Sequence, residues 1–129
     1  MLYRLIYMSE PVGSTGVSTL SLAHLVGVAE RNNRRDRITS GIMFHEGLCL
    51  HALEGARADV DRLMGRLRED RRHRNIRVLV DKPIAERRFC EAMGLCEDPP
   101  AMLRAIGSPE MAAITGYDAE RIVEFKQAA

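Results

Sequence analysis

Apolar and polar positions along the chain predict a β-hairpin from Ile38 to Gly55. Two apolar runs flank a short polar tip at 45–47, as in two strands joined by a turn. In these runs the residues that point to one face of the sheet and those that point to the other are both largely apolar. We therefore expect the hairpin to be central in its sheet and covered on both faces. His51 interrupts the second run. A buried imidazole there needs a hydrogen bond to offset the hydration that it loses. From the hairpin alone, a buried histidine whose hydrogen bonds are made within the protein is the commoner case. Contact of His51 with a ligand is the alternative.

Two segments have the spacing of amphipathic helices that pack one face on a sheet. The first begins at a serine N-cap, Ser18 or Ser21, and ends at 31–34, where two asparagines replace apolar residues. The second follows the hairpin, has Asp59 in its first turn and places two arginines at 71–72, near its end, where the helix dipole favours them. The two apolar stripes are Leu22, Leu25, Val26 and Ala29, and then Val60, Leu63, Met64 and Leu67.

Three more strands complete the pattern. The stretch 2–9 is rich in aromatic and branched residues and ends at the breaker cluster 10–16. Residues 76–80 alternate and are closed by Lys82-Pro83, and 87–95 forms a plausible fifth strand. The order is β-α-β-β-α-β-β, which predicts an α+β, ferredoxin-like sheet with an added strand and with both helices on one face.

The chain beyond Asp98-Pro99-Pro100 changes to short helical pieces. They are a turn and a half at 101–106, a helix start at 108–110 and a last segment that Asp118 can cap. The tail carries apolar residues such as Ile122, Val123 and Phe125, which need cover. We therefore expect one domain at 1–97 and a helical extension, 98–129, on the sheet face that the two main helices leave open.

Composition excludes several classes of protein. A chain of 129 residues can bury a core without a metal or a disulfide. Its 19 basic and 18 acidic residues nearly balance, which argues against a general nucleic-acid binder. The three cysteines have no metal-ligand spacing and fit reduced thiols in a cytoplasmic protein. No apolar segment approaches the ~20 residues of a membrane span, so no membrane contact is expected.

Two polar groups besides His51 are candidates for ligand contact. Tyr7 lies near the carboxyl end of the first strand, where a tyrosine is most often a core residue whose hydroxyl finds a partner. Asn32 and Asn33 end the first helix, and their ordinary role is a turn. A carboxamide also carries a donor and an acceptor and can therefore match an imide edge.

Several short motifs, in their order and spacing over about the first 97 residues, resemble the BLUF domain, a flavin-binding blue-light sensor. Each is weak alone, and together they are specific. They are Ile6-Tyr7-Met8-Ser9, Ala29 to Asn33, Ile38-Thr39, Gly47, Leu53-Glu54-Gly55, Asp70 to His73 and Arg87-Arg88-Phe89.

The resemblance implies a noncovalent FAD, with FMN possible, held between the two helices against the sheet. In this family a strand-one tyrosine and a hairpin glutamine meet at the flavin, and blue light rearranges their hydrogen bonds and produces a small reversible red shift. No substrate is converted, so no enzyme activity, catalytic residue or metal is expected. The matching positions here are Tyr7, Asn33 with Asn32 beside it, Arg66, Asp70 and Met93.

The chain departs from the family pattern at the hairpin. Counting back from Leu53-Glu54-Gly55, the glutamine position is His51, so this residue is expected at the flavin. An imidazole can donate one hydrogen bond and cannot repeat the rearrangement of a carboxamide, which places the photocycle in doubt. Ser40 also replaces a usual glycine, the common tryptophan is absent, and the segment Phe89 to Gly94 is one residue short of the usual spacing.

The leading function is thus a flavin-binding light sensor that signals through protein contacts, with a separate downstream partner and self-association expected. Its first rival is a degenerate member of the same fold that lacks the light response or the flavin. An acylphosphatase-like enzyme would need an arginine in the loop 10–16, which has none. An RNA-binding sheet would need more stacking aromatics than Tyr3, Tyr7 and Phe44 provide.

Overall fold

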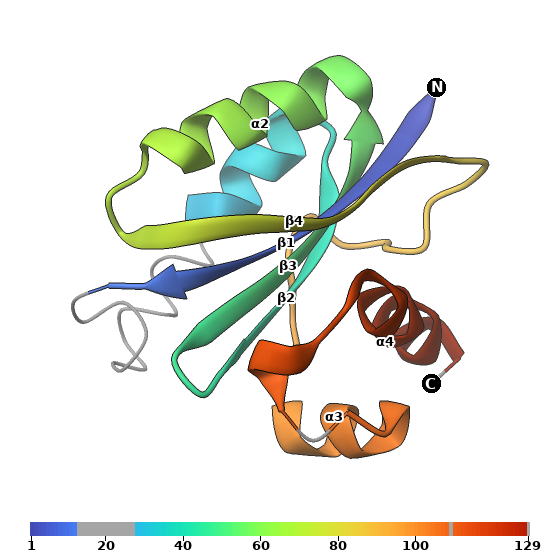
Figure 1. Cartoon of the computed structure of the whole chain (residues 1–129). Coiled ribbons are helices and arrows are strands. Elements are labelled where there is room, and N and C mark those ends of the chain that lie inside the picture. Colours follow the sequence, from blue (N-terminus) through green and yellow to red (C-terminus); the bar gives the residue numbers. More distant parts are fainter. Residues whose placement is uncertain (13–27, 109, 129) are drawn as a thin grey trace.

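The computed structural model describes residues 1–12, 28–108 and 110–128, and these form a sheet with helices on both faces (Figure 1). The five strands run in the order β4-β1-β3-β2-β5. All neighbours are antiparallel except β2 and β5. The predicted ferredoxin-like α+β arrangement with an added strand is therefore confirmed. The strands are β1 (Leu2–Pro11), β2 (Thr39–His45), β3 (Leu48–Ala56), β4 (His73–Ile84) and β5 (Gly94–Leu95).

The hairpin turn sets the register of the central strands. Glu46 and Gly47 both have positive φ, 51° and 75°, as in the two-residue turn that matches the twist of paired strands. With this turn closed, Ile42 lies opposite His51 across β2 and β3. On the other side of β3, Tyr7 lies opposite His51. Both faces of β3 are buried, as the apolar pattern predicts.

One face of the sheet is covered by α2 (Arg57–Glu69) and the helical segment 28–35 (Figure 1). The expected serine caps of the first helix lie outside the described residues. The second helix ends at Glu69, so the two arginines at 71–72, expected near its end, lie just beyond it, and Arg66 and Arg68 are the basic residues of its last turn. It stops there because the Asp70 carboxylate accepts the backbone N–H of Arg72 and turns the chain into β4. The core under α2 consists of Leu5, Tyr7, Ile38, Leu53, Val60, Leu63 and Met64.

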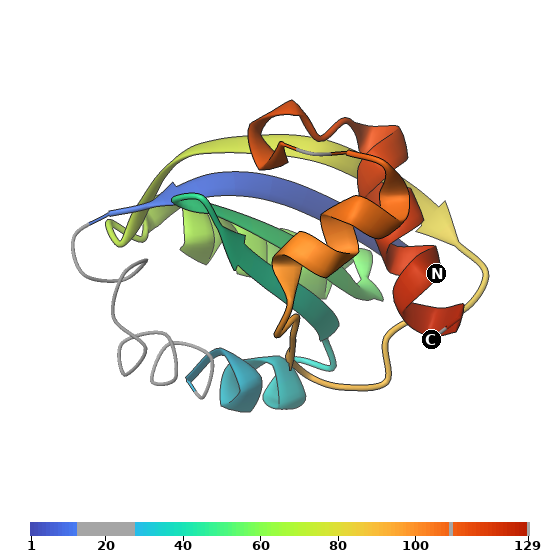
Figure 2. The same cartoon turned by 90° about the horizontal axis from the view of Figure 1, so that it is seen from below.

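The opposite face is covered by α3 (Pro99–Ile106), a short 3-10 turn (Met111–Ala113) and α4 (Gly116–Ala128), which is the placement expected for the tail (Figure 2). A Cβ on Gly116 would lie 2.7 Å from the Leu79 carbonyl oxygen, so the start of α4 packs closely on the β4 backbone. The core here includes Ile6, Met8, Met43, Leu50, Leu103, Met111, Ile114 and Val123.

Two details of the tail differ from the prediction. Thr115, rather than Asp118, caps α4: the Thr115 hydroxyl accepts the Asp118 N–H, and the Asp118 carboxylate accepts the Thr115 N–H, both at 3.2 Å. The helix start expected at 108–110 includes Pro109, which lies outside the described residues, and the structure has only the 3-10 turn that begins at Met111.

The predicted fifth strand is wrong over most of its length, because only Gly94–Leu95 pair with β2. The Glu54 carboxylate accepts hydrogen bonds from the backbone N–H groups of Arg88 and Phe89 at 2.7 and 2.9 Å. These two donors are therefore not available for pairing with a neighbouring strand. Phe89 then packs over Gly41, where an added Cβ would lie 2.5 Å from its ring.

A cluster of four charged side chains, two of them buried, connects α4 to the sheet. Arg4 and Glu54 are cross-strand neighbours, 3% and 0% exposed, and the Arg4 Nε donates to Glu54 at 2.9 Å. The same guanidinium reaches Glu120 of α4 at 2.9 Å, and Lys82 reaches Glu120 at 2.8 Å. Two positive and two negative groups thus join three strands to one helix.

No helix among the described residues is long and apolar enough to cross a membrane.

Candidate functional site

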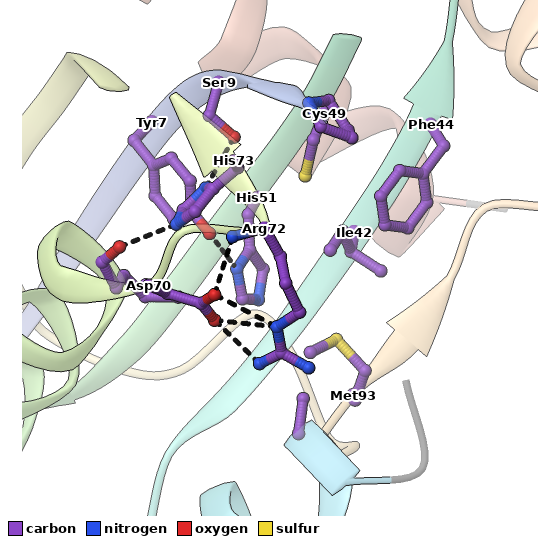
Figure 3. Close-up of a pocket in the computed structure, with 13 residues that line it drawn as sticks. Tyr7, Ser9, Ile42, Phe44, Cys49, His51, Asp70, Arg72, His73 and Met93 are labelled. Carbon is purple, nitrogen blue, oxygen red and sulfur yellow. Dashed lines mark hydrogen bonds and ion pairs between the residues drawn. The ribbon is translucent and has the colours of Figure 1, made fainter. Parts of the chain in front are cut away.

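A cleft opens on the α2 face of the sheet, between the segment 28–35, the central strands and the turn that follows α2 (Figure 3). Its floor comes from alternate residues of β1, β2 and β3, because side chains two apart on a strand share a face. The apolar lining includes Ala29, Ile42, Phe44, Leu67 and Met93. The polar groups in the lining are Tyr7, Ser9, His51, Asp70, Arg72 and His73.

Tyr7 and His51 form a buried pair at the centre of the floor. The strand register sets them opposite each other, the Tyr7 Oη lies 2.9 Å from the His51 Nδ1, and the rings meet edge to face. Burial, with smaller effects of Cys49 and Asp70, raises the pKa of Tyr7 well above its ordinary value. Burial and then the neighbouring His73 lower the pKa of His51 to about 3. The pair is therefore a neutral phenol and a neutral imidazole.

The second ring nitrogen of His51 has no hydrogen-bond partner among the described residues. This Nε2 atom is fully buried on a side chain that lines the cleft, and the residue as a whole is 4% exposed. Leaving a buried polar group unpaired costs about 1–3 kcal/mol, so such atoms in a cleft point to a ligand that completes them.

His73 also contacts the Tyr7 ring edge to face. Its Nε2 donates to the Leu67 carbonyl oxygen at 2.7 Å, and its Nδ1 lies 3.0 Å from the Ser9 hydroxyl. Both ring nitrogens are thus used, unlike those of His51. Both imidazoles meet the Tyr7 ring edge to face, with ring centroids 5.4 Å away for His51 and 6.2 Å away for His73 (Figure 3).

The charged residues of the cleft lie in the turn after α2. The Arg72 guanidinium pairs with the Asp70 carboxylate at 2.7 Å, and this contact lowers the pKa of Asp70. Cys49 contributes a thiol whose pKa burial raises to about 12, so it is a small apolar group here. The site therefore combines one ion pair, a neutral hydrogen-bonded floor and apolar walls.

The residues expected at the site do not all lie in this cleft. Tyr7, His51, Asp70 and Met93 line it. Asn33 lines a neighbouring groove that shares Met93, and its amide donates to the Ala92 carbonyl oxygen at 2.9 Å.

Two other expected residues line neither the cleft nor this groove. Arg66 pairs with Asp36 at 2.8 Å on the surface. Asn32 is half-buried, and its backbone carbonyl accepts the Asp36 N–H.

Sequence reasoning missed three polar residues of the cleft, Ser9, Arg72 and His73. Strand parity was a usable signal for the first, because Ser9 lies two residues beyond Tyr7 and on the same face. The other two belong to the motif Asp70 to His73, of which only Asp70 matches a position expected at the flavin.

Comparison with known proteins decides the family. A family model named BLUF and described as "Sensors of blue-light using FAD" matches residues 2–94. The chain belongs to the BLUF family. It is thus a sensor domain of the blue-light, flavin-using type, and the BLUF resemblance read from the motifs is confirmed.

Individual BLUF relatives agree with this. Photoactivated adenylate cyclase subunit alpha of Euglena gracilis is 28% identical over 102 residues, which are 79% of this chain and 10% of that protein. The BLUF chain thus spans about a tenth of the length of this curated relative.

Solved structures match over more of their own length. The photo-activated state of BlsA superposes with a TM-score of 0.86 at 20% identity, over 100% of this chain and 96% of that one, which supports the fold. Klebsiella pneumoniae BlrP1 with FMN and cyclic diGMP gives a TM-score of 0.67 at 29% identity, over 74% of this chain and 26% of that one.

Proposed function

We propose that this BLUF chain binds a flavin noncovalently in the cleft under α2 and passes a signal to a separate protein partner. The observation that carries the proposal is the buried, unpartnered Nε2 of His51 beside Tyr7, in an otherwise largely apolar cleft. A planar heterocycle with hydrogen-bond acceptors on its edge would satisfy this atom and would suit the apolar walls.

The chain's own residues would divide the work of holding the flavin. Tyr7 and His51 would meet the polar edge of the ring, while Ile42, Leu67 and Met93 would cover apolar parts. When bound, the flavin supplies absorption of blue light and acceptance of an electron. Cofactor identity is part of the proposal: we propose FAD, with FMN as the alternative that the BlrP1 structure with FMN makes reasonable.

Binding requires the cleft to widen. Its volume is about 70 Å³, whereas ligand sites usually span about 300–1,000 Å³. Arg72 is the side chain best able to move, since it is 52% exposed and joins Asp70 through an exposed ion pair, which is worth at most about 1 kcal/mol. Asn32, Asn33 and Arg66 remain proposed contacts, and each would have to leave its present surroundings.

His51 would alter the light response. Its imidazole can donate to the flavin and cannot exchange donor and acceptor as a carboxamide does. We therefore infer a flavin-bound protein without the family's red shift.

Residues 1–97 would form the flavin-binding part, and 98–129 an extension on the far face of the sheet. Contacts with a partner protein and between copies of the chain would carry the signal.

A flavin titration with matched variants tests the proposal. The protein is refolded with excess FAD, FMN or riboflavin, and stoichiometry and affinity are measured for wild type, Asp70→Asn and Asp61→Asn. Both aspartates pair with an arginine at the α2 side of the molecule, and only Asp70 lines the cleft.

We propose that the Asp70 carboxylate, which lines the cleft at a family-matched position, also accepts a hydrogen bond from the flavin. The expected result is one flavin per chain, with affinity reduced roughly 3- to 10-fold by Asp70→Asn, as for weakening of that one hydrogen bond, and unchanged by Asp61→Asn. No uptake of any of the three flavins would overturn the proposed function.

A further inference from the structure

Arg87 carries a positive charge that the fold does not neutralise. Three arginines of the described part of the chain are buried or half-buried, Arg4, Arg57 and Arg87. Arg4 and Arg57 pair with carboxylates, and Arg87 has no ion pair among the described residues. The positions outside these residues, 13–27, 109 and 129, contain no aspartate or glutamate. An acidic side chain of this chain is therefore not the counter-ion of Arg87.

Hydrogen bonds hold the Arg87 guanidinium in one position. One terminal nitrogen donates to the Thr39 hydroxyl oxygen at 2.8 Å and to the Glu54 carbonyl oxygen at 2.7 Å, and the other donates to the Arg37 carbonyl oxygen at 2.9 Å. The Nε–H has no hydrogen-bond partner among the described residues. A side chain fixed in this way loses little further freedom when it binds an anion. Arg87 is therefore pre-organised, with an uncompensated charge and one donor unused.

Arg87 lines a surface groove of about 570 Å³, a volume within the usual range of small-molecule sites. The groove lies between the helical segment 28–35, the start of β2 and the segment 87–93, and it shares only Met93 with the cleft that contains Tyr7 and His51. Positive charge is in excess around it. Its charged lining residues are Glu30, Arg34, Arg37, Arg87 and Glu91.

Arg37 occupies a backbone position that usually carries glycine. Its φ is 58°, the Ile38 N–H donates to the Asn33 carbonyl oxygen at 2.9 Å, and the Arg37 N–H donates to the Arg34 carbonyl oxygen at 3.4 Å. These two bonds are those of the Schellman motif at a helix end, whose left-handed position favours glycine because a Cβ is strained there. The turn alone therefore does not explain an arginine at this position. Its side chain is exposed and lines the groove.

We propose that this groove binds a phosphate group, held by the Nε–H of Arg87 and the side chain of Arg37, as a site separate from the flavin cleft. Arginine N–H groups are the preferred protein partners of phosphate oxygens. A phosphate carries up to about two negative charges, so it can neutralise both arginines at once. Arg34 can turn toward the same group, because its pair with Glu30 is exposed and therefore weak.

Glu91 is the group in the groove that opposes an anion. Its carboxylate lines the groove, and it has no ion pair among the described residues. Replacing it with glutamine removes a like charge and should therefore raise the affinity for phosphate. Arg37→Gln removes an attractive charge and should lower that affinity. The two substitutions thus have opposite expected signs at one site.

Titration calorimetry with inorganic phosphate, at neutral pH and with ionic strength held constant by chloride, tests the proposal on the full chain. Arg68→Gln is the matched control for Arg37→Gln, because both arginines are exposed and without an ion pair among the described residues, and only Arg37 lines the groove. The affinity should fall at least roughly threefold in Arg37→Gln, stay unchanged in Arg68→Gln and rise in Glu91→Gln. No binding to wild type, or equal losses in the two arginine variants, would overturn the proposal.

Arg37→Gly separates the binding role of the side chain from its role in the turn. Glycine suits the positive φ, so this variant should unfold at the same urea concentration as wild type or a higher one. Its affinity for phosphate should nevertheless fall at least as far as that of Arg37→Gln. Unchanged affinity in this folded variant would overturn the proposal.

NMR locates the bound phosphate. The arginine Nε–H signals are followed during the titration, and that of Arg87 is assigned by its loss in Arg87→Lys. Selective shifts of the Arg87 and Arg37 signals support the proposal, and equal shifts across the exposed arginines would overturn it by showing general screening.

The flavin in the cleft is the other possible source of a phosphate. Riboflavin has none, so protein loaded with riboflavin should bind inorganic phosphate as flavin-free protein does, and protein loaded with FAD should do the same. Loss of phosphate binding with FAD alone would mean that the groove takes the diphosphate of the flavin, which would overturn a separate site. Failure to take up any flavin would overturn the proposed function and leave this inference standing, because flavin-free protein tests it.

Discussion

Burial of a neutral histidine should make the flavin-free protein sensitive to mild acid, and replacing His51 with glutamine should remove that part of the sensitivity. The pKa of His51 is lowered from 6.5 to about 3, first by burial and then by His73. Above the unfolded value of 6.5 the imidazole is neutral in both states and costs nothing. As the pH falls toward 3, His51 binds a proton in the unfolded chain and stays neutral in the folded chain, so the free energy of unfolding decreases.

The size of the effect follows from linkage. Between about pH 7 and about pH 5 the two pKa values correspond to a loss of about 2 kcal/mol in the free energy of unfolding. The groups around His51 are Tyr7, His73 and the Asp70–Arg72 pair, with Cys49 beyond them. These groups stay in the variant, so their own titration largely cancels in the comparison.

Urea denaturation of wild type and His51→Gln, followed by circular dichroism at several pH values across this window, measures the effect. His45→Gln is the matched control, since His45 lies at the hairpin end and is more exposed. Equal pH dependence in wild type and His51→Gln would refute the reasoning and mean that His51 is accessible to protons in the folded state.

Three further predictions concern other residues. Glu54→Gln should lower the free energy of unfolding by about 3 kcal/mol, because Arg4 stays buried without its nearest carboxylate; chemical denaturation checks this, and a change below about 1 kcal/mol would contradict it. Gly41→Ala should cost about 1–3 kcal/mol, since its Cβ would meet the Phe89 ring at 2.5 Å, and Phe89→Leu should recover part of that loss in a double-mutant denaturation cycle. Tyr7→Phe should brighten the fluorescence of bound flavin, because Tyr7 is expected to quench it by electron transfer, and unchanged fluorescence would exclude that role.

Local periodicity explains why much of the fold could be predicted. The hairpin and the two helical stripes bury their apolar faces as the residue spacing requires, and strand register then brings Tyr7 opposite His51. The segment 87–93 could not be predicted in the same way. Its composition suits a strand, but a carboxylate more than thirty residues earlier in the sequence, that of Glu54, captures its N–H groups.

Site residues that share one face of a strand could be predicted from the sequence. Site residues whose contacts depend on how helices and turns are placed could not. Whether Arg66 faces a cleft or pairs with Asp36 depends on how α2 sits beside the segment 28–35, which spacing does not encode. The position of Arg72 likewise depends on where α2 ends, and that end is set by the Asp70 turn rather than by the helical stripe.

We propose that this BLUF chain holds a flavin against Tyr7 and that His51 occupies the position at which the family's light response arises. The absorption difference spectrum, dark minus lit, of the flavin-loaded wild type and His51→Gln tests it most directly. We expect a bound flavin with no reversible red shift in wild type and at least a partial red shift in His51→Gln. A normal red shift in wild type would contradict this expectation, because an imidazole, which cannot exchange donor and acceptor as a carboxamide does, would then be able to switch.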